Sequence, residues 1–369
     1  MAAPSVTVAY VLAAGLGTRL RPLTQERPKP LIEVCGTPLL VHTLRLLARA
    51  GLRAVGVNSH WLHPQIPRAL GASFQGMRVV TTEEPEVLGT GGGLRGLAAA
   101  LPAPAGERVL VMNADALIDL DLRALLAAPD DALATLLLKA DPDTHKYGAI
   151  GTDADDRITS FAGRIAPRGP VVRERMFCGV HLVHPRAFEV LPPVTLQDGV
   201  VRGPMSGIND EGYPRWLEQG ALLRGFDHAG TFCDVGTPER LLEANLAVLG
   251  GSWASTHLLP FVGLEERPGR VFVSPAARVH PSARFTGPAL VDADADIGEG
   301  AELCWAVVGK RARVAAGARV VGAVLQSDAA LAGDAVDAVV SSTCMAQVAP
   351  VVAARIRAEW AEWAGGAVR

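Results

Sequence analysis

Cysteine and long hydrophobic runs are scarce in this sequence, and each shortage narrows the class of protein. The five cysteines are odd in number, lie scattered from Cys35 to Cys344 and never form a Cys-x-x-Cys pair. This usage favours reduced, buried thiols and predicts a cytoplasmic protein. No apolar stretch reaches the ~18 residues of a membrane span, and the N-terminus lacks the charged region of a signal peptide, so we expect no membrane partner.

Clustered positive charge, the mark of a nucleic-acid-binding surface, is also missing. The formal net charge is −3, the isoelectric point is about 6.3, and only four of the 35 cationic residues are lysines. We therefore expect no nucleic acid as a partner. What the chain does have is ample hydrophobic content, 49% of 369 residues, which suits a globular protein of about two domains.

One stretch, Val8–Leu40, dominates what is present. It begins within an apolar run that predicts a buried strand, and Gly15 and Gly17 follow where that strand ends. Backbone N–H groups in such a turn can cradle phosphate. Arg19 and Lys29 add positive charge, and the prolines on both sides of Lys29 are expected to hold its backbone extended.

This stretch fits neither common nucleotide-binding motif. The third glycine of the dinucleotide fingerprint is Leu20 here, and the Gly-Lys-Ser/Thr of the P-loop is absent. It resembles instead the signature of the sugar-nucleotide pyrophosphorylases, L-A-G-G-x-G-T-R-L-x-P-L-T followed by P-K-P-L. The resemblance implies catalytic roles for Arg19 and Lys29, and nucleotide binding by Leu12, Ala13, Ala14, Gly15, Gly17 and Thr18.

A second glycine-rich segment spans 83–94 and reads EEPEVLGTGGGL. Because a run of glycines is a poor helix interior, we expect the glycines to form the entrance to a helix that starts near Leu94. The alternative is a flexible surface loop. The segment resembles the family's E-x-x-L-G-T-A-G-x-L, which packs on the base, and this implies nucleotide binding by Leu88, Gly89, Thr90 and Gly91.

Two further segments supply carboxylates. An apolar run from Val109 predicts a strand that delivers Asn113 and Asp115 at its end, where a carboxylate facing a triphosphate suits Mg²⁺. The segment resembles the family's N-G-D. Asp234 resembles the aspartate of W-x-D-x-G-T, which implies a second metal ligand. Helix capping is the alternative role for these aspartates, and Asp121 is itself a candidate cap.

The sugar side of the site departs from the family pattern. Lys146-Tyr147-Gly148 resembles the family's Y-G-V, but Gly163 and Arg164 stand where Glu-Lys is usual. Phe177-Cys178-Gly179 replaces Asn-Ala-Gly. The sugar must therefore be held differently, and Arg164 remains able to bind phosphate. The resemblance implies substrate binding by Asn113, Tyr147, Gly148, Arg164 and Gly179, and Glu174, near the last segment, is a further candidate for sugar contact.

The order of patterns along the chain predicts the fold. Strand-helix alternation indicates an α/β, Rossmann-like, mixed and mostly parallel sheet. From Val271 small and aliphatic residues recur every six positions, which predicts a left-handed parallel β-helix of hexapeptide repeats, with a one-residue slip near Trp305. We expect a nucleotidyltransferase domain at 1–250, a linker at 251–270, the β-helix at 271–349 and a C-terminal helix at 350–369.

The resemblance implies an enzyme that joins a nucleoside triphosphate to a sugar 1-phosphate with Mg²⁺ as cofactor. The overall layout looks most like mannose-1-phosphate guanylyltransferases, so we expect GTP and mannose 1-phosphate as the substrates. Uridylyl or thymidylyl transfer to another sugar 1-phosphate and a regulatory subunit that only binds nucleotide sugar remain alternatives. In sugar-nucleotide pyrophosphorylases hexapeptide repeats commonly mediate assembly, so the resemblance implies a homo-oligomer. An acyltransferase role for the β-helix is disfavoured, because the region is short and holds only His280.

Overall fold

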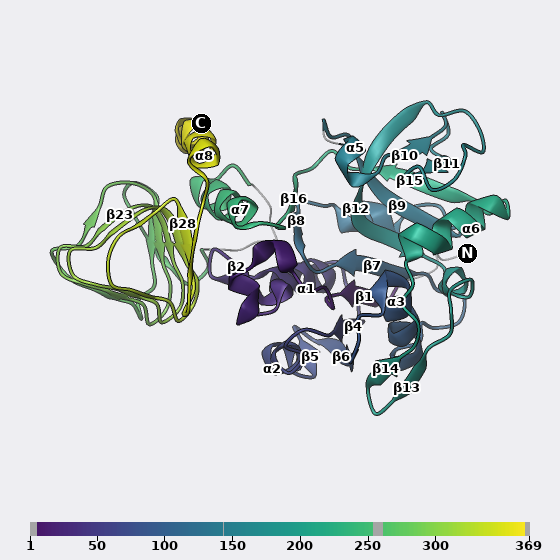
Figure 1. Cartoon of the computed structure of the whole chain (residues 1–369), viewed down its shortest axis with the longest axis horizontal. Coiled ribbons are helices and arrows are strands. Elements are labelled where there is room, and N and C mark those ends of the chain that lie inside the picture. Colours follow the sequence, from purple (N-terminus) through teal and green to yellow (C-terminus); the bar gives the residue numbers. More distant parts are fainter. Residues whose placement is uncertain (1–5, 143, 254–260, 366–369) are drawn as a thin grey trace. The chain divides into compact units, whose positions relative to one another are not determined.

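The structure, a computed structural model, describes residues 6–142, 144–253 and 261–365 (Figure 1). The chain packs as two compact units, each assembled from separated segments. The first comprises Met1–Leu16, Thr43–Ala114 and Leu120–Phe232, and the second comprises Gly17–His42, Asp115–Asp119 and Cys233–Arg369. None of the helices formed by the described residues combines the length and the hydrophobicity of a membrane span.

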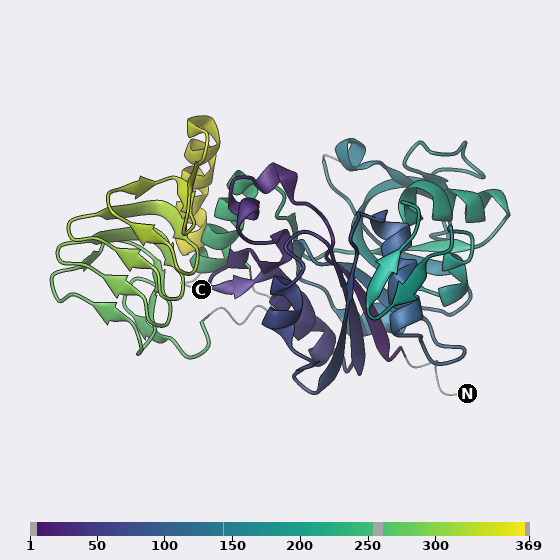
Figure 2. The ribbon, with the colours of Figure 1, turned by 60° about the horizontal axis from the view of Figure 1, so that its bottom comes forward.

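The first unit is built on a mixed sheet with a parallel centre (Figure 2). Strand β1 (Val8–Leu12) lies between β4 (Ala54–Ser59) and β7 (Val109–Asn113), and all three run parallel. Strand β6 (Met77–Glu83) continues the parallel order beyond β4. The sheet confirms the α/β expectation. Because β1 and β7 end level, with Leu12 opposite Asn113, the loops that follow them leave the same edge.

The other side of this sheet is antiparallel. Strand β12 (Arg173–Val183) pairs with β7 and with β9 (Ala134–Lys139), and β9 pairs in parallel with β15 (Leu223–Asp227). Strands β10 (Ile150–Thr152) and β11 (Ile158–Phe161) extend this side. Strand β9 is an apolar run that is buried along nearly its whole length, as suits a strand inside a sheet.

Helix α3 (Gly89–Ala100) corrects one expectation. The glycine run is the first turn of the helix rather than its entrance, so the helix begins five residues before Leu94. Contacts with the rest of the unit override the low helix propensity of glycine here. These contacts are described below.

The second unit contains a parallel β-helix, as the six-residue period predicted. Its strands run from β18 (Val271–Val273) to β28 (Ala338–Val340), and each coil stacks in parallel on the next. Arg278 pairs with Asp296 and Asp296 with Arg313, offsets of 18 and then 17 residues. The shorter coil is the slip expected near Trp305. The repeating alanines and aliphatic residues form one buried core, including Ala289, Ala295, Ala301, Val291, Ile297 and Leu303.

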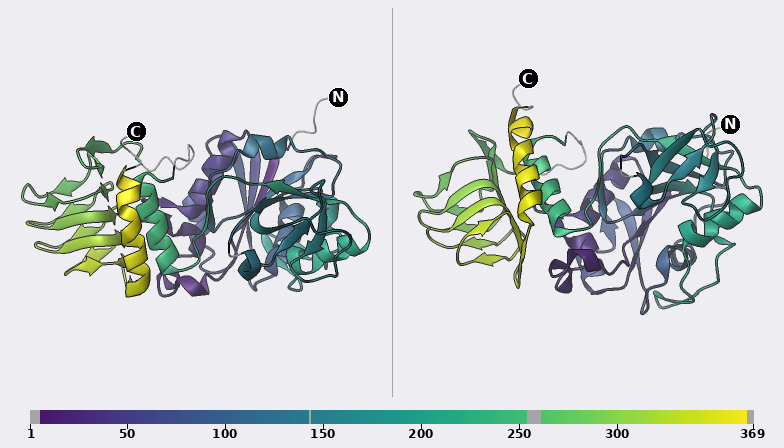
Figure 3. Two further views of the ribbon diagram at one scale, coloured as in Figure 1. Left: turned by 90° about the horizontal axis from the view of Figure 1, so that it is seen from above. Right: turned by 45° about the horizontal axis from the view of Figure 1, so that its top comes forward.

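Two helices of the second unit lie side by side along the coils (Figure 3). They are α7 (Pro238–Gly250) and α8 (Pro350–Gly365). Arg355 of α8 donates to Glu243 of α7 at 3.0 and 3.1 Å, and the ring of Trp360 stacks on Trp305 with centroids 5.1 Å apart. Apolar residues from both helices, from the coils and from the loop 20–39 share a second core, so the loop and the β-helix form one packed body.

Candidate active site

The loop after β1 folds back on itself in three short 3₁₀ turns: Thr18–Leu20, Leu23–Gln25 and Lys29–Leu31. Gly17 has a φ of 60°, and a Cβ there would lie 3.0 Å from both Lys29 Cβ and Thr24 Cγ2. Glycine therefore lets the loop close on Lys29. The expectation of an extended Lys29 was wrong. The Ile32 N–H donates to the Lys29 carbonyl at 3.0 Å and holds this residue in a 3₁₀ turn.

Four charged side chains of the second unit meet beside this loop, and we name them the charged cluster. The Lys29 ammonium lies 2.8 Å from Asp115 Oδ2 and 3.4 Å from Asp234 Oδ1. Arg19 Nη2 lies 3.4 Å from Asp234 Oδ2. The Lys29 side chain is 9% exposed, whereas Asp115 and Asp234 are 39% and 23% exposed. A nearly buried cation thus faces two carboxylates that solvent or a ligand can reach.

Two short strands bring the aspartates together. Strand β8 (Ala116–Ile118) pairs with β16 (Phe232–Asp234), and the Val235 N–H donates to the Asp115 carbonyl at 3.2 Å. Neither aspartate caps a helix. Thr237 caps α7 by accepting the Arg240 N–H at 3.3 Å, and Asp121 caps α4 (Leu122–Leu126) as expected.

The donor set of the charged cluster fits a divalent cation. Both aspartates offer hard carboxylate oxygens, which Mg²⁺ prefers, and they already attract a cation, the Lys29 ammonium. Within the described ranges no three His, Cys, Asp or Glu side chains gather at one point. Mg²⁺ commonly binds through one or two carboxylates together with substrate phosphates. Two aspartates are therefore enough protein ligands for it.

The first unit connects two predicted nucleotide-binding segments through a buried polar chain. Asn58 Oδ1 accepts the Ala13 N–H at 2.7 Å, and Asn58 Nδ2 donates to Glu84 Oε1 at 2.6 Å. Glu84 Oε2 accepts the Leu88 N–H at 3.1 Å. Glu84 is 1% exposed, and this burial raises the pKa of its carboxyl group. The hydrogen bonds from Asn58 and Leu88 act in the opposite direction and favour the charged form. Asn58 and Glu84 therefore fix Ala13 relative to Leu88.

Sequence reasoning missed Asn58 and Glu84. One signal for each was present: Asn58 lies near the end of the strand after the signature, and Glu84 is an acidic residue four positions before Leu88. Neither carries the mark of a reacting group, and only the sheet order reveals that they meet.

The glycines of α3 make room for the protein's own chain. A Cβ on Gly91 would lie 2.7 Å from Ser206 Oγ, and one on Gly93 would lie 2.5 Å from Asn58 Nδ2. Thr90 Oγ1 accepts the Ile208 N–H at 3.0 Å. Gly15 differs, because a Cβ there would meet nothing within 4 Å. Close packing within the unit therefore explains Gly91 and Gly93 without a base, whereas the turn at Gly15 is open.

The predicted sugar-side residues are partly brought together. Gly179 has a φ of 69°, and a Cβ there would lie 2.6 Å from Asn113 Nδ2, so these two predicted residues touch. Gly179 lies within a register shift of β12 between Phe177 and His181. Such irregularities are common beside active sites. Glu174 lies on the same strand five residues before Gly179, a separation of about 16 Å at the rise of an extended chain.

Arg164 has a partner that the sequence did not suggest. Its Nη2 lies 2.5 Å from Asp210 Oδ1, and both side chains are more than half exposed. Gly148 has a φ of 84° and packs close to Ala162. Tyr147 ends helix α5 (Thr144–Tyr147), and its side chain lies outside the described residues.

A buried pair involves Tyr213, which lies three residues after Asp210 in the chain. Nδ1 of His181 hydrogen-bonds the Tyr213 hydroxyl. Burial lowers the pKa of His181 to about 3, so its ring is neutral, and burial raises the pKa of Tyr213. Tyr213 directly follows a π-helical turn, Ile208–Gly212, which carries Asp210. A neutral, fully buried pair of this kind is a structural support rather than an acid or base.

Comparison with known proteins places this geometry in a family. The family model described as nucleotidyl transferase matches residues 8–250. A mannose-1-phosphate guanylyltransferase of Mycobacterium tuberculosis is 29% identical over 313 residues, 84% of this chain and 81% of the relative. An N-acetylmuramate alpha-1-phosphate uridylyltransferase of Neisseria meningitidis is 33% identical over 255 residues, 66% of this chain and 99% of the relative.

Solved structures share the fold. HddC from Yersinia pseudotuberculosis, complexed with GMP-PN, covers 65% of this chain and 98% of its own at a TM-score of 0.52 and 21% identity. The match of the family model over most of the chain, together with the Neisseria relative, is decisive. This chain belongs to the nucleotidyl transferase family.

Proposed function

We propose that the chain is a sugar-1-phosphate nucleotidyltransferase that makes GDP-mannose and pyrophosphate from GTP and mannose 1-phosphate. The observation that carries the proposal is the charged cluster, in which one nearly buried lysine faces two accessible aspartates. Relatives named as mannose-1-phosphate guanylyltransferases, from Mycobacterium tuberculosis and Drosophila melanogaster among others, support this choice of sugar and base.

The proposed chemistry is an in-line displacement at the α-phosphorus. An oxygen of the sugar phosphate forms a bond to the α-phosphorus, and the bond from that phosphorus to the bridging oxygen breaks, so pyrophosphate leaves with the electron pair. A phosphate monoester has a second pKa near ~6 and is already ionised at neutral pH. No general base is needed, and the catalytic contribution is positioning and charge stabilisation.

Lys29 and Arg19 have distinct parts in this proposal. The Lys29 ammonium, held on a 3₁₀ turn and nearly buried, is assigned to the phosphate oxygens around the reacting centre. Arg19 is 66% exposed, and we assign it to the β- and γ-phosphates and the departing pyrophosphate. Asp115 and Asp234 would hold Mg²⁺, which supplies charge neutralisation for the phosphates when bound.

The first unit is assigned to recognition of the reactants. We propose that segments 12–15 and 88–91 of this unit bind the nucleotide, together with Gly17 and Thr18 of the loop after β1. The contact between Asn113 and Gly179 supports their assignment to the sugar. Gly148, Tyr147, Arg164 and Glu174 remain proposed sugar-side residues. A homo-oligomer assembled through the β-helix and a cytoplasmic location also remain proposals.

One observation favours a second substrate pair. The Neisseria relative, named as an N-acetylmuramate alpha-1-phosphate uridylyltransferase, has the higher identity of the two, 33% against 29%. Uridylyl transfer to N-acetylmuramate 1-phosphate would use the same charged cluster with a different base and sugar.

The test is pyrophosphate release by the purified full chain with Mg²⁺, across four nucleoside triphosphates and several sugar 1-phosphates. We expect the strongest signal with GTP and mannose 1-phosphate. A strongest signal with UTP and N-acetylmuramate 1-phosphate would replace the substrates and keep the mechanism. Silence across the grid together with tight binding of a nucleotide sugar would contradict catalysis and favour a regulatory role.

A further inference from the structure

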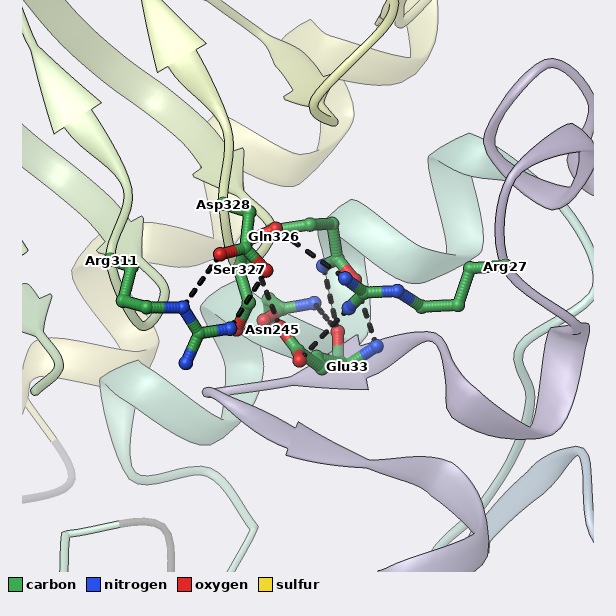
Figure 4. Close-up of polar contacts among 7 residues, drawn as sticks. All are labelled: Arg27, Glu33, Asn245, Arg311, Gln326, Ser327 and Asp328. Atoms are coloured by element: carbon green, nitrogen blue, oxygen red, sulfur yellow. Dashed lines mark hydrogen bonds and ion pairs between the residues drawn. The ribbon is translucent and has the colours of Figure 1, made fainter. Parts of the chain in front are cut away.

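A buried carboxylate four residues after Lys29 joins the active-site loop to the β-helix (Figure 4). Glu33 opens strand β2 (Glu33–Val34) and is 7% exposed. Its Oε2 accepts the Ser327 N–H at 2.9 Å and the Ser327 hydroxyl at 2.8 Å, and its Oε1 accepts from Arg27 Nη1 at 2.9 Å. Both carboxylate oxygens are thus used by partners in the same unit.

The backbone of Glu33 is held as firmly as its side chain. Gln326 Oε1 accepts the Glu33 N–H at 2.8 Å, and Gln326 Nε2 donates to the Glu33 carbonyl at 3.0 Å. One amide side chain of the β-helix thereby takes both peptide groups, as a neighbouring strand would. Asn245 of α7 extends the arrangement by accepting the Cys35 N–H at 2.8 Å. We call Glu33, Gln326 and Ser327 the clamp.

The far end of the same hairpin also meets the β-helix. Strands β2 and β3 (Thr37–Pro38) are joined by Cys35 and Gly36, with φ of 48° and 71°, a tight turn that favours glycine. A Cβ on Gly36 would lie 2.2 Å from Asp292 Oδ2, so the turn sits directly on a coil of the β-helix. The hairpin is therefore fixed at both ends by coils of the β-helix.

The backbone between Lys29 and the clamp has little conformational freedom. The intervening residues form the 3₁₀ turn Lys29–Leu31, closed by hydrogen bonds from Leu31 to Pro28 and from Ile32 to Lys29 of 2.8 and 3.0 Å. Pro30 lies within it and restricts the backbone further. A shift of Glu33 is therefore passed on to the Lys29 backbone rather than absorbed.

Attachment alone does not require this arrangement. The loop and the β-helix already share an apolar core, which includes Ile32 and Val34, and burying a carboxylate is a costly way to add stability. Buried polar networks instead fix one register against alternatives. The clamp sets one position of the loop, and Lys29 is the residue whose position matters there.

We propose that Glu33 is a positioning residue for transfer and that the Gln326–Ser327 turn makes the β-helix a working part of the active site. The inference rests on the proposed function. Lys29 must keep its ammonium at a fixed place beside Asp115 and Asp234 while the phosphates react, and displacement of a reacting geometry by about 1 Å can lower a rate roughly 10²-fold.

The test variant is Gln326→Met with Ser327→Ala, which removes the amide and hydroxyl contacts but leaves Glu33 and the Ser327 N–H in place. We expect kcat to fall roughly 10- to 100-fold, with KM for both substrates within about threefold. The single variant Ser327→Thr keeps a hydroxyl for Glu33 and should keep most of the wild-type rate. Arg311→Ala is the matched control. It breaks the Arg311–Asp328 pair, at 2.6 and 2.8 Å, beside the clamp without removing a bond to Glu33, and should keep wild-type kcat.

Thermal unfolding is measured on every variant so that loss of folded protein is not mistaken for loss of positioning. An unchanged kcat in the double variant overturns the inference. So does a loss of kcat that follows only the folded fraction, or one equalled by Arg311→Ala. If the wild type is silent with every substrate pair, the proposed function fails and takes this inference with it. An active wild type with an unimpaired double variant overturns the inference alone.

Discussion

Two polar clusters of the second unit each join one loop, residues 17–42, to other segments, and they differ in how fully the protein's own groups satisfy their hydrogen bonds. In the charged cluster Asp115 and Asp234 remain 39% and 23% exposed, and two of the three contacts are as long as 3.4 Å. In the clamp both carboxylate oxygens and both peptide groups of Glu33 have partners within 3.0 Å.

This difference distinguishes side chains that can still bind a ligand from side chains that only hold the loop in place. Open carboxylates beside a cation have bonding capacity left for a ligand, whereas a satisfied, buried carboxylate has none. Substitutions in the charged cluster should therefore remove activity and spare folding. Substitutions in the clamp should lower stability, or should change activity only by displacing Lys29. The following predictions test that separation from its largest effect to its smallest.

Lys29→Met should have the largest effect on rate. Its ammonium is assigned to the charge of the reacting phosphates, so we expect kcat to fall roughly 10²- to 10³-fold. The free energy of unfolding should change by less than about 1 kcal/mol, because its carboxylate partners stay hydrated. Pyrophosphate release and urea unfolding measure the two quantities. Near-normal turnover would remove Lys29 from the mechanism.

Asp234→Asn should come next. It takes away one carboxylate of the proposed Mg²⁺ site, and we expect kcat to fall roughly 10²-fold, with more Mg²⁺ needed for half-maximal rate. The matched control is Asp121→Asn, which changes an aspartate that caps α4 and should leave the rate unaltered. Chelation of Mg²⁺ by EDTA should stop the wild type reversibly. Equal Mg²⁺ dependence in both variants would contradict the assignment of Asp234.

The two glycine-rich segments should respond in opposite ways to one added methyl group. Gly91→Ala places a Cβ 2.7 Å from Ser206 Oγ, and we expect a loss of about 1–3 kcal/mol in the free energy of unfolding. Gly15→Ala meets nothing within 4 Å, so stability should hold while KM for the triphosphate rises. Urea unfolding and initial rates distinguish them. A stable Gly91→Ala protein would show that the helix has room to relax.

The smallest effect concerns the pH dependence of stability near the hairpin. Burial raises the pKa of Asp292, so the fold favours its neutral form. Its stabilising contribution is complete below the unfolded pKa, near ~3.9, and is lost as pH rises through the folded value. Asp292→Asn mimics the neutral form and keeps an oxygen for the Ala293 N–H. The variant should gain stability relative to wild type as pH rises from ~4 toward 7. If the free energies of unfolding of the variant and the wild type change in parallel over this pH range, the expectation is contradicted.

Much of the fold follows from local patterns. The buried strands are apolar runs. A period of six predicts the β-helix, because each coil repeats the same small and aliphatic positions. The start of α3 did not follow. Glycine propensity argues against a helical turn at Gly89–Gly93, and only packing against Ser206 and Asn58 explains it.

The residues proposed for catalysis could be named from the sequence, because their types suit phosphate chemistry and their segments resemble the family signature; their roles stay predictions. Arg19, Lys29, Asp115 and Asp234 indeed meet. Their supports were not predictable. Glu33 and Ser327 are nearly three hundred positions apart, 294 in sequence, and ordinary in type. Their meeting depends on which coil of the β-helix faces the loop, and no local pattern specifies that.

The most direct test of this account is product identification by mass spectrometry. Full-length wild type and Lys29→Met are incubated with GTP, mannose 1-phosphate and Mg²⁺, and the nucleotide sugar and pyrophosphate are quantified. The account predicts GDP-mannose and pyrophosphate in equal amounts from the wild type and at least ~10²-fold less from the folded variant. Equal product from both proteins would contradict the central role of the charged cluster.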